Sequence, residues 1–451
     1  MVIAISWLIM AKEFQLLRWS FPTALGVYYI GHLSMQFIPA LFLLQDPQLP
    51  ASSKYLWACV LTAILIPVSG IIGSFLYNNS AVSADQVRWS RFNNMSEARA
   101  AKQFVVILGI VASLILVSFI RHSSSAPVLH LFQQTHETRE LNQLRRYVLD
   151  ESIPGAYQYL YGFTQVCLMP FLFLVAFTLW RHLRSVRFRV FLLYCMGVAM
   201  VYNSYASRKT PIAMMFVLAF IAYWINRDPS SVRGHRPLQF RRVFVLTFTL
   251  LCAVGYPILV FKFKAFGESK TVWEILVHGV LTRIFTKPAF NTYMAFEVFP
   301  DREAFTAMMD INKLATLFGK EFVPLSHVIA FYKGQEWFVN APPASVGNFY
   351  ALAGWLGVVV GTILATVILK AFQGALASCQ RWTVMHTVIY TFLLYGAFRI
   401  NFANFHTVFM TEVFVPICFF WMFWNALLKR ASRRDSVMLD RMGAVQCPVE
   451  S

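Results

Sequence analysis

Charged residues are scarce in this sequence, and their scarcity excludes most classes of soluble protein. Only 13% of the 451 residues are Asp, Glu, Lys or Arg, whereas soluble domains contain about 25%. Hydrophobic residues make up 58% of the chain, and aromatic residues make up 16%. Disordered, collagen-like and coiled-coil chains and ordinary soluble enzymes are therefore excluded, and a polytopic membrane protein remains.

Cysteine motifs and the sequence features of a signal peptide are also lacking. The seven cysteines form no CxxC pair and no Cys/His cluster, so they predict no metal or redox centre. The first ten residues are largely apolar, but they lack the basic start and the small-residue cleavage site of a signal peptide. The alternatives for this stretch are an interfacial helix and part of an eleventh span. No nucleotide-binding motif or acidic metal cluster is evident, and no cofactor is expected.

The sequence does contain a series of long apolar segments. A helix needs about 20 apolar residues to cross a bilayer. We predict an all-α fold in which residues 1–451 form a single integral membrane domain of about ten spans. The middle of these spans contains no Asp or Lys, which argues against an ion pathway, and we interpret the mid-span His32 as a packing residue. The predicted spans are 23–44, 55–77, 103–120, 157–180, 190–206, 210–226, 243–261, 346–369, 383–400 and 407–428.

The distribution of Lys and Arg predicts the orientation. One set of alternate segments contains 22 of the 39 Lys and Arg residues but only seven of the 21 Asp and Glu residues. By the positive-inside rule this side is cytoplasmic, and both termini lie there. The formal net charge of +18 therefore indicates topology and anionic lipid rather than nucleic acid. The segments counted are the N-terminus, 78–102, 181–189, 227–242, 370–382 and the C-terminal tail.

Two segments on the opposite side are long and polar. Residues 121–156 resemble a polar helix, and residues 262–345 form a loop of 84 residues between the seventh and eighth spans. The second loop carries nine Lys or Arg and eight Asp or Glu residues. Loops of this length are usually functional or partly structured, so we look for the functional residues on this side.

Cations cluster at the predicted outer membrane surface in two places. Arg208 and Lys209 lie at the tip of a short hairpin, and Thr210–Pro211 behind them favours a helix start, which attracts anions. Arg283 and Lys287 lie in an apolar stretch of the long loop and would share one face of a helix. Both pairs fit a phosphate ligand. The alternatives are snorkelling side chains for the first pair and an interfacial helix for the second.

A third polar cluster follows the return of the long loop to the membrane. In this return, Ser345 is predicted to cap a helix, and the GxxxG spacing of Gly357 and Gly361 predicts close approach to another helix. Further on, one turn contains a dense set of polar residues, which we expect to converge with Arg208 at the outer surface. The set is Arg399, Asn401, Asn404, His406 and Glu412. A general base is not identified, and the candidates are His327, Glu297, Glu336 and His406.

This order of features resembles that of the bacterial Wzy-type polymerases of oligosaccharide repeat units, which are relatives of the O-antigen ligases. The resemblance is one of layout across most of the chain, with three short motifs. Ala206-Ser207-Arg208 matches the hairpin, and Arg283-Ile284-Phe285 matches a motif of the long loop. The loop exit is matched by Pro343, Ser345, Gly347, Tyr350, Gly354 and Gly357.

The resemblance implies a GT-C-like glycosyltransferase of the bacterial inner membrane that needs no metal and joins polyprenyl-diphosphate-linked oligosaccharides on the periplasmic face. Its partners would be these lipid-linked glycans, membrane lipids and a chain-length regulator protein. Arg208 and Arg283 would be catalytic, with Lys209, Lys287, Arg399, His406 and Tyr350 binding pyrophosphate or glycan. The alternatives are an O-antigen ligase, which shares the donor but not the acceptor, and a flippase. A flippase would need a charged cavity through the bundle, which the spans lack.

Overall fold

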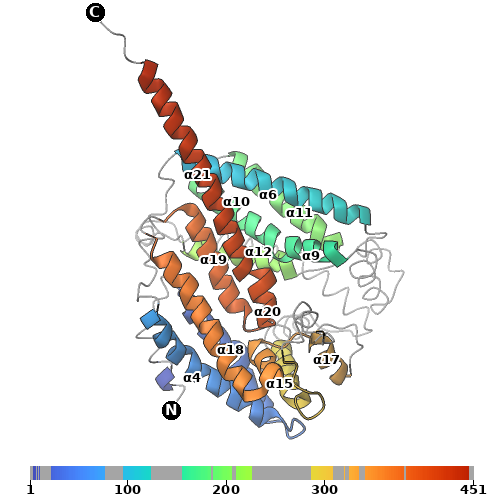
Figure 1. The fold of residues 1–451 in the computed structure, drawn as a ribbon. Helices are drawn as coiled ribbons and strands as arrows, with labels where there is room; N and C mark the ends of the chain where they lie inside the picture. Colours follow the sequence, from blue (N-terminus) through green and yellow to red (C-terminus); the bar gives the residue numbers. More distant parts are fainter. Residues whose placement is uncertain are drawn as a thin grey trace, which may run out of the picture.

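In the computed structural model, every regular element of the described residues is a helix, which confirms the predicted all-α class for this part of the chain (Figure 1). The described residues are 4–6, 8, 10, 22–76, 95–122, 155–183, 186–205, 210–225, 286–307, 319, 325–334, 341–379 and 382–445. The α-helices are α2 (Ala24–His32), α3 (Ile38–Leu43), α4 (Ser52–Leu76), α6 (Met95–His122), α9 (Gly155–Phe163), α10 (Met169–Leu183), α11 (Val186–Tyr205), α12 (Thr210–Ile225), α15 (Lys287–Val298), α17 (Leu325–Tyr332), α18 (Ser345–Ala377), α19 (Val384–Arg399), α20 (Phe405–Thr407) and α21 (Phe414–Val445).

Helices occupy the predicted spans, except for residues 243–261, which lie outside the described residues. By length and composition, five helices of the described part could cross a membrane, so the chain has the character of a multi-pass membrane protein. The total of ten spans and the cytoplasmic position of both termini stay predictions. The five candidates are Ser52–Leu76, Ser96–His122, Tyr159–Trp180, Ser345–Ala377 and Phe405–Arg433.

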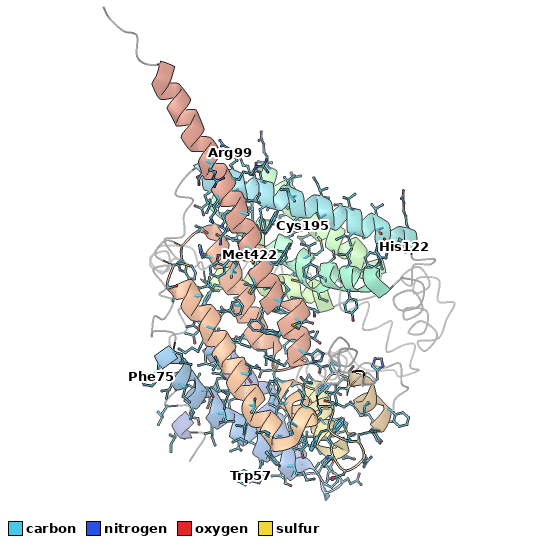
Figure 2. All side chains as sticks on the ribbon, in the orientation of Figure 1. Trp57, Phe75, Arg99, His122, Cys195 and Met422 are labelled. Atoms are coloured by element: carbon cyan, nitrogen blue, oxygen red, sulfur yellow. The ribbon has the colours of Figure 1, made fainter. Side chains whose placement is uncertain are left out.

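Large apolar side chains cover the outside of these helices, as expected for contact with lipid. Trp57 and Phe75 of α4 and Met422 of α21 point away from the bundle, with exposed fractions of 65%, 85% and 73% (Figure 2). Exposed apolar side chains of this size and number are unusual on a soluble monomer. Arg99 and His122 lie near the two ends of α6, on either side of its apolar stretch (Figure 2).

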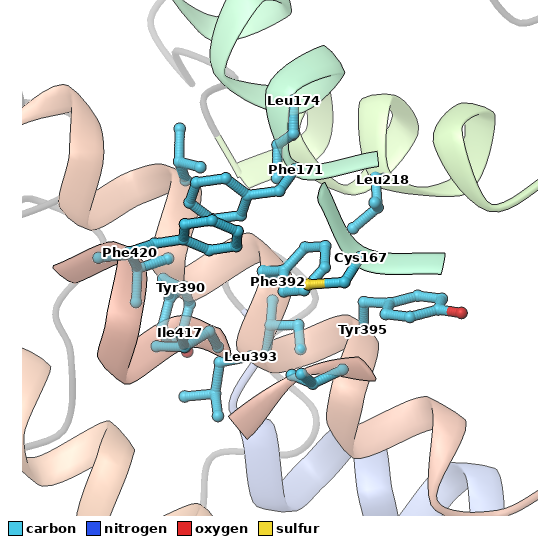
Figure 3. Close-up of a cluster of buried hydrophobic side chains, with 14 of the residues drawn as sticks. Cys167, Phe171, Leu174, Leu218, Tyr390, Phe392, Leu393, Tyr395, Ile417 and Phe420 are labelled. Atoms are coloured by element: carbon cyan, nitrogen blue, oxygen red, sulfur yellow. The ribbon is translucent and has the colours of Figure 1, made fainter. Parts of the chain in front are cut away.

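Two groups of buried side chains hold the helices together. The larger group joins α2, α6, α10, α19 and α21, and in it Phe171 stacks on Phe420 with ring centroids 4.1 Å apart (Figure 3). The smaller group joins α4, α15, α17 and the start of α18, and in it Phe296 stacks on Tyr350, also at 4.1 Å. Helix α15 belongs to the predicted loop 262–345, so part of this loop is built into the helix bundle.

Three predicted spans contain a π-helical segment, and each segment is followed by a proline. The segments are η1 (Leu33–Phe37), η3 (Thr164–Leu168) and η6 (Val408–Glu412), and the prolines are Pro39, Pro170 and Pro416. Proline has no backbone N–H and clashes with the preceding turn, so the helix changes its hydrogen-bonding pattern there. Such π segments often occur at functional sites.

The helix α18 is broken near its start, and the break brings its two parts into close contact. Gly354 has a φ of 62°, a conformation that other residues adopt only with strain. Beyond the break, Gly357 and Gly361 pack against Phe349 of the first part of the same helix. The close approach expected at the GxxxG pair is therefore present, and the partner at Phe349 is the short helical segment that precedes the break.

Replacing Gly357 with alanine is expected to destabilise the protein by about 1–3 kcal/mol, the usual cost of overpacking. The added Cβ would overlap the carbonyl oxygen of Phe349, and backbone atoms cannot move aside cheaply. Thermal unfolding in detergent measures the effect. Gly197→Ala is the control because nothing lies within 4 Å of its added Cβ. Equal melting temperatures for the two variants would show that the contact with Phe349 is unimportant.

Candidate functional site

Residues of α15 and of the end of α19 contact the 341–345 segment, which leads into α18. On one side of the segment, Ala344 N donates to Thr292 Oγ1 at 2.9 Å, and Asn291 Nδ2 donates to the Pro342 carbonyl at 3.3 Å. On the other side, Ser345 N donates to the carbonyl of Ile400 at 3.2 Å. The segment therefore joins α15 of the long loop to the end of α19, two of the regions that the sequence analysis singled out.

The role predicted for Ser345 is wrong. Ala344 occupies the capping position of α18, and Ser345 is the first residue of the helix. The buried Ser345 hydroxyl lies near the hydroxyl of Tyr28, although the two do not reach hydrogen-bond geometry. A side chain from a distant helix, Thr292, accepts the Ala344 N–H instead, so a tertiary contact defines this helix start.

A buried network of uncharged polar groups lies behind this segment. Gln36 Nε2 donates to the carbonyl of Asn401 at 2.7 Å, and Tyr55 OH donates to Gln36 Oε1 at 2.9 Å. Asn401 Nδ2 in turn donates to the carbonyl of Tyr28 at 3.1 Å. These bonds connect η1, α4 and α2 to the turn after α19, so they fix the position of that turn. His32 Nε2 lies 2.9 Å from the carbonyl of Cys59, as expected for a packing histidine.

Arg399, predicted to bind the substrate, has a carboxylate partner within the protein. Its Nε donates to Glu412 Oε2 at 2.8 Å and its Nη2 donates to Glu412 Oε1 at 3.0 Å. The guanidinium also lies over the ring of Phe402, 4.6 Å from its centroid. Both charged side chains are largely buried, with 18% and 6% of their surface exposed. This two-bond pair balances the charge of Arg399, so an anionic substrate would have to compete with Glu412.

Lys333 is a cation of the site that the sequence analysis missed. It follows α17, and its Nζ donates to Asn291 Oδ1 at 2.6 Å while lying 4.9 Å from the centre of the Phe290 ring. Burial, and secondly the nearby charge of Lys287, lower the pKa of Lys333 to about 8. In the sequence, the only indication of a helix end at this lysine is the glycine that follows it. In the structure, Gly334 has a positive φ of 67°, and the helix ends there.

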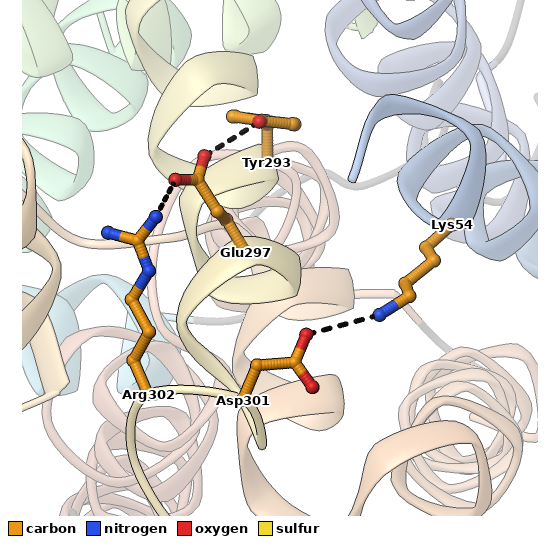
Figure 4. Close-up of polar contacts among 5 residues, drawn as sticks. All are labelled: Lys54, Tyr293, Glu297, Asp301 and Arg302. Carbon is orange, nitrogen blue, oxygen red and sulfur yellow. Dashed lines mark hydrogen bonds and ion pairs between the residues drawn. The ribbon is translucent and has the colours of Figure 1, made fainter. Parts of the chain in front are cut away.

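Carboxylates and their donors surround the end of α15 (Figure 4). Tyr293 OH donates to Glu297 Oε2 and Arg302 Nη2 donates to Glu297 Oε1, both at 2.7 Å. Burial and the Glu297 carboxylate raise the pKa of Tyr293. Lys54 and Asp301 form an exposed pair at 3.4 Å. Both oxygens of Glu297 are thus occupied, which makes it a weaker candidate for the general base than its sequence position suggested.

The structure describes only some of the other predicted site residues. Tyr350 is buried, and the rings of Phe296, Phe305 and Trp355 surround it. His406 is half-buried in α20, and Lys287 is exposed at the start of α15. Among the predicted residues, Arg208, Lys209, Arg283 and the candidate base Glu336 lie outside the described residues. Comparisons with protein-family models, with curated proteins and with solved structures found no match to this chain.

Proposed function

We propose that the protein is a membrane glycosyltransferase that polymerises polyprenyl-diphosphate-linked oligosaccharide repeat units on the periplasmic face of a bacterial inner membrane. The product would be O-antigen, capsule or exopolysaccharide. The observation that supports this proposal most is the meeting of α15, the 341–345 segment and the end of α19. It gathers Lys287, Lys333 and Arg399 around a region that the sequence predicts to be one membrane surface.

The chemistry of the proposed reaction needs few kinds of residue. A sugar hydroxyl of one lipid-linked unit attacks the anomeric carbon of another, and the bond from that carbon to the diphosphate oxygen breaks. The hydroxyl proton goes to a base, and the lipid diphosphate leaves with additional negative charge. Preorganised Arg and Lys side chains stabilise this charge as it develops. In our proposal Arg208 and Arg283 have this role, and Lys209 and Lys287 assist them.

The distribution of charge also favours an enzyme acting at one membrane surface over a flippase. A flippase for a charged lipid diphosphate would need cations along a path through the bundle. Among the described residues, the buried polar network of Gln36, Tyr55 and Asn401 carries no charge. The described cations of the candidate site lie at helix ends or in the turns beyond them.

The proposal is tested with purified protein and lipid-linked repeat units in detergent. We expect the units to be lengthened without any nucleotide sugar and in the presence of EDTA, because Lys and Arg rather than a metal ion hold the leaving group. A strict requirement for a divalent ion would contradict this mechanism even if polymer forms.

A gene deletion distinguishes a polymerase from a ligase and from a flippase. Loss of a polymerase leaves single repeat units that are still transferred, whereas loss of a ligase leaves long polymer on its carrier lipid. Loss of a flippase leaves lipid-linked units on the cytoplasmic side. We expect only single units, and either of the other two outcomes would exclude the polymerase.

A further inference from the structure

Two exposed aromatic rings lie at the break in α18, on the predicted outer side of the protein. Phe305 and Trp355 flank the buried Tyr350, with ring centroids 6.0 Å and 5.9 Å from it, and each meets it edge-on at 84°. Phe305 is 38% exposed and Trp355 is 43% exposed. We call Phe305 and Trp355 the aromatic pair. Exposed apolar groups with a polar rim often mark a binding surface.

Specific contacts fix the position of the aromatic pair. The turn that follows α15 is joined to α18 just before the break, because Thr306 N donates to the carbonyl of Ala351 at 2.8 Å. At Gly354, an added Cβ would lie 3.0 Å from Phe305 Cζ, so the missing side chain leaves room for this ring against the backbone. Contact with lipid needs no such fixed geometry, whereas a rigid surface binds a ligand with a smaller loss of entropy.

Charged side chains surround the aromatic pair, and the two cations among them have carboxylate partners. Lys54 pairs with Asp301 at 3.4 Å, and Arg302 pairs with Glu297 at 2.7 Å (Figure 4). Surfaces that bind anionic headgroups carry clusters of basic side chains. Because the cations here are already balanced, this surface has little attraction for a phosphate.

The carboxylates beside the aromatic pair suit the hydroxyl groups of a sugar. Asp301 and Glu303 are exposed on the same turn as Phe305. Asp301 accepts from Lys54 at 3.4 Å, and Glu303 accepts from Tyr332 OH at 2.9 Å. A carboxylate has room for about four hydrogen bonds, so both can accept further bonds from hydroxyl groups. Ligand sites commonly combine aromatic side chains with a few polar groups that fix the orientation of the ligand.

We propose that the aromatic pair binds a neutral sugar residue of an oligosaccharide, with sugar hydroxyl groups donating to Asp301 and Glu303. This sugar site adjoins the candidate functional site, because Tyr332, the partner of Glu303, directly precedes Lys333. The assignment of the sugar to one substrate rests on the proposed function. In a polymerase it would belong to the acceptor unit, since the carboxylates would repel the diphosphate of the donor.

The test measures glycan binding by the purified full-length protein in a polyoxyethylene detergent, since the headgroup of a maltoside detergent is itself a sugar. The probe is an array of oligosaccharides released from the surface polysaccharides of the source organism. Calorimetry with an oligosaccharide that binds gives the affinity. We expect Trp355→Leu to weaken binding about tenfold, the upper end of what one aromatic contact contributes. Trp355→Phe should keep most of the affinity because a flat ring remains.

An exposed tryptophan outside the sugar site provides the matched control. Trp57 of α4 is 65% exposed and lies near the predicted outer end of its span, so Trp57→Leu should bind like the wild type. Affinity should stay level when the salt concentration rises from about 0.05 to about 0.5 M, because charge does not hold a neutral sugar. Each variant should elute from size-exclusion chromatography like the wild type, which shows that it is folded.

The outcomes separate the sugar site from the enzyme. If no oligosaccharide binds, if high salt abolishes binding, or if Trp355→Leu keeps the wild-type affinity, the sugar site is wrong. Equal losses in Trp57→Leu and Trp355→Leu would instead assign both side chains to anchoring at the membrane interface. If binding requires Trp355 but deletion of the gene leaves glycan of full length, the sugar site stands and the proposed polymerase fails. If Trp355→Leu lengthens repeat units at the wild-type rate, the polymerase stands and the sugar site is wrong.

Discussion

Replacing Arg208 or Arg283 with alanine is expected to abolish chain growth, with a loss of about 10²–10³ in rate for each. This is the typical cost of removing one preorganised contact to a charge that develops in the transition state. In the proposed reaction that charge appears on the diphosphate as the sugar leaves. The length distribution of the glycan in a deletion strain complemented with each variant gives the first measurement, and single-turnover rates with purified protein give the second.

The lysine variants show whether the shape of the guanidinium matters as well as its charge. Arg208→Lys and Arg283→Lys should recover only part of the activity, because an ammonium group cannot make the two parallel hydrogen bonds of a planar fork. Membrane insertion and protein amount must be equal in all strains. Long polymer at normal protein amounts in both alanine variants would exclude these arginines from the pyrophosphate site.

Removing Glu412 is expected to have the largest effect on stability. Glu412→Ala would leave the largely buried guanidinium of Arg399 without its carboxylate, and breaking a buried pair in this way costs about 3–5 kcal/mol. The double variant Arg399→Met, Glu412→Leu should recover much of this stability, since two apolar side chains replace the pair and leave no charge behind. Thermal unfolding in detergent compares the two variants.

An exposed ion pair provides the control for this comparison. Lys54 and Asp301 are 45% and 62% exposed, so Asp301→Ala should cost at most about 1 kcal/mol. If Glu412→Ala unfolds at the same temperature as Asp301→Ala, the Arg399–Glu412 pair does not stabilise the bundle. Such a result would mean that Arg399 can bind substrate without a large loss of stability.

Part of the candidate site could be predicted because its residues are neighbours in sequence. Arg399, Asn401 and Glu412 lie within 14 residues, so they were expected to form one cluster, and in the structure Arg399 and Glu412 touch. The sequence could not show that Glu412 neutralises Arg399, since this depends on how η6 orients the carboxylate. Lys333 escaped prediction for a related reason: its partner Asn291 is 42 residues away, and no spacing rule connects the two.

The membrane character and the helical class were determined by the sequence itself. Within the bilayer, each spanning segment must form its own backbone hydrogen bonds and must be apolar over a fixed length. The composition of a single segment is therefore sufficient to identify a span. The prolines that follow the π segments, such as Pro39 and Pro170, also act locally, because each one changes the hydrogen bonding of its own helix.

Only the tertiary structure decided which polar groups meet. It placed α15 of the predicted loop against α4 and α18, joined Thr292 to Ala344, and folded the start of α18 onto Gly357 and Gly361. These contacts join segments whose separation in sequence carries no information about their distance in space. They depend on the shapes of several packed helices at once, and a side chain's partner is therefore decided after the helices have assembled.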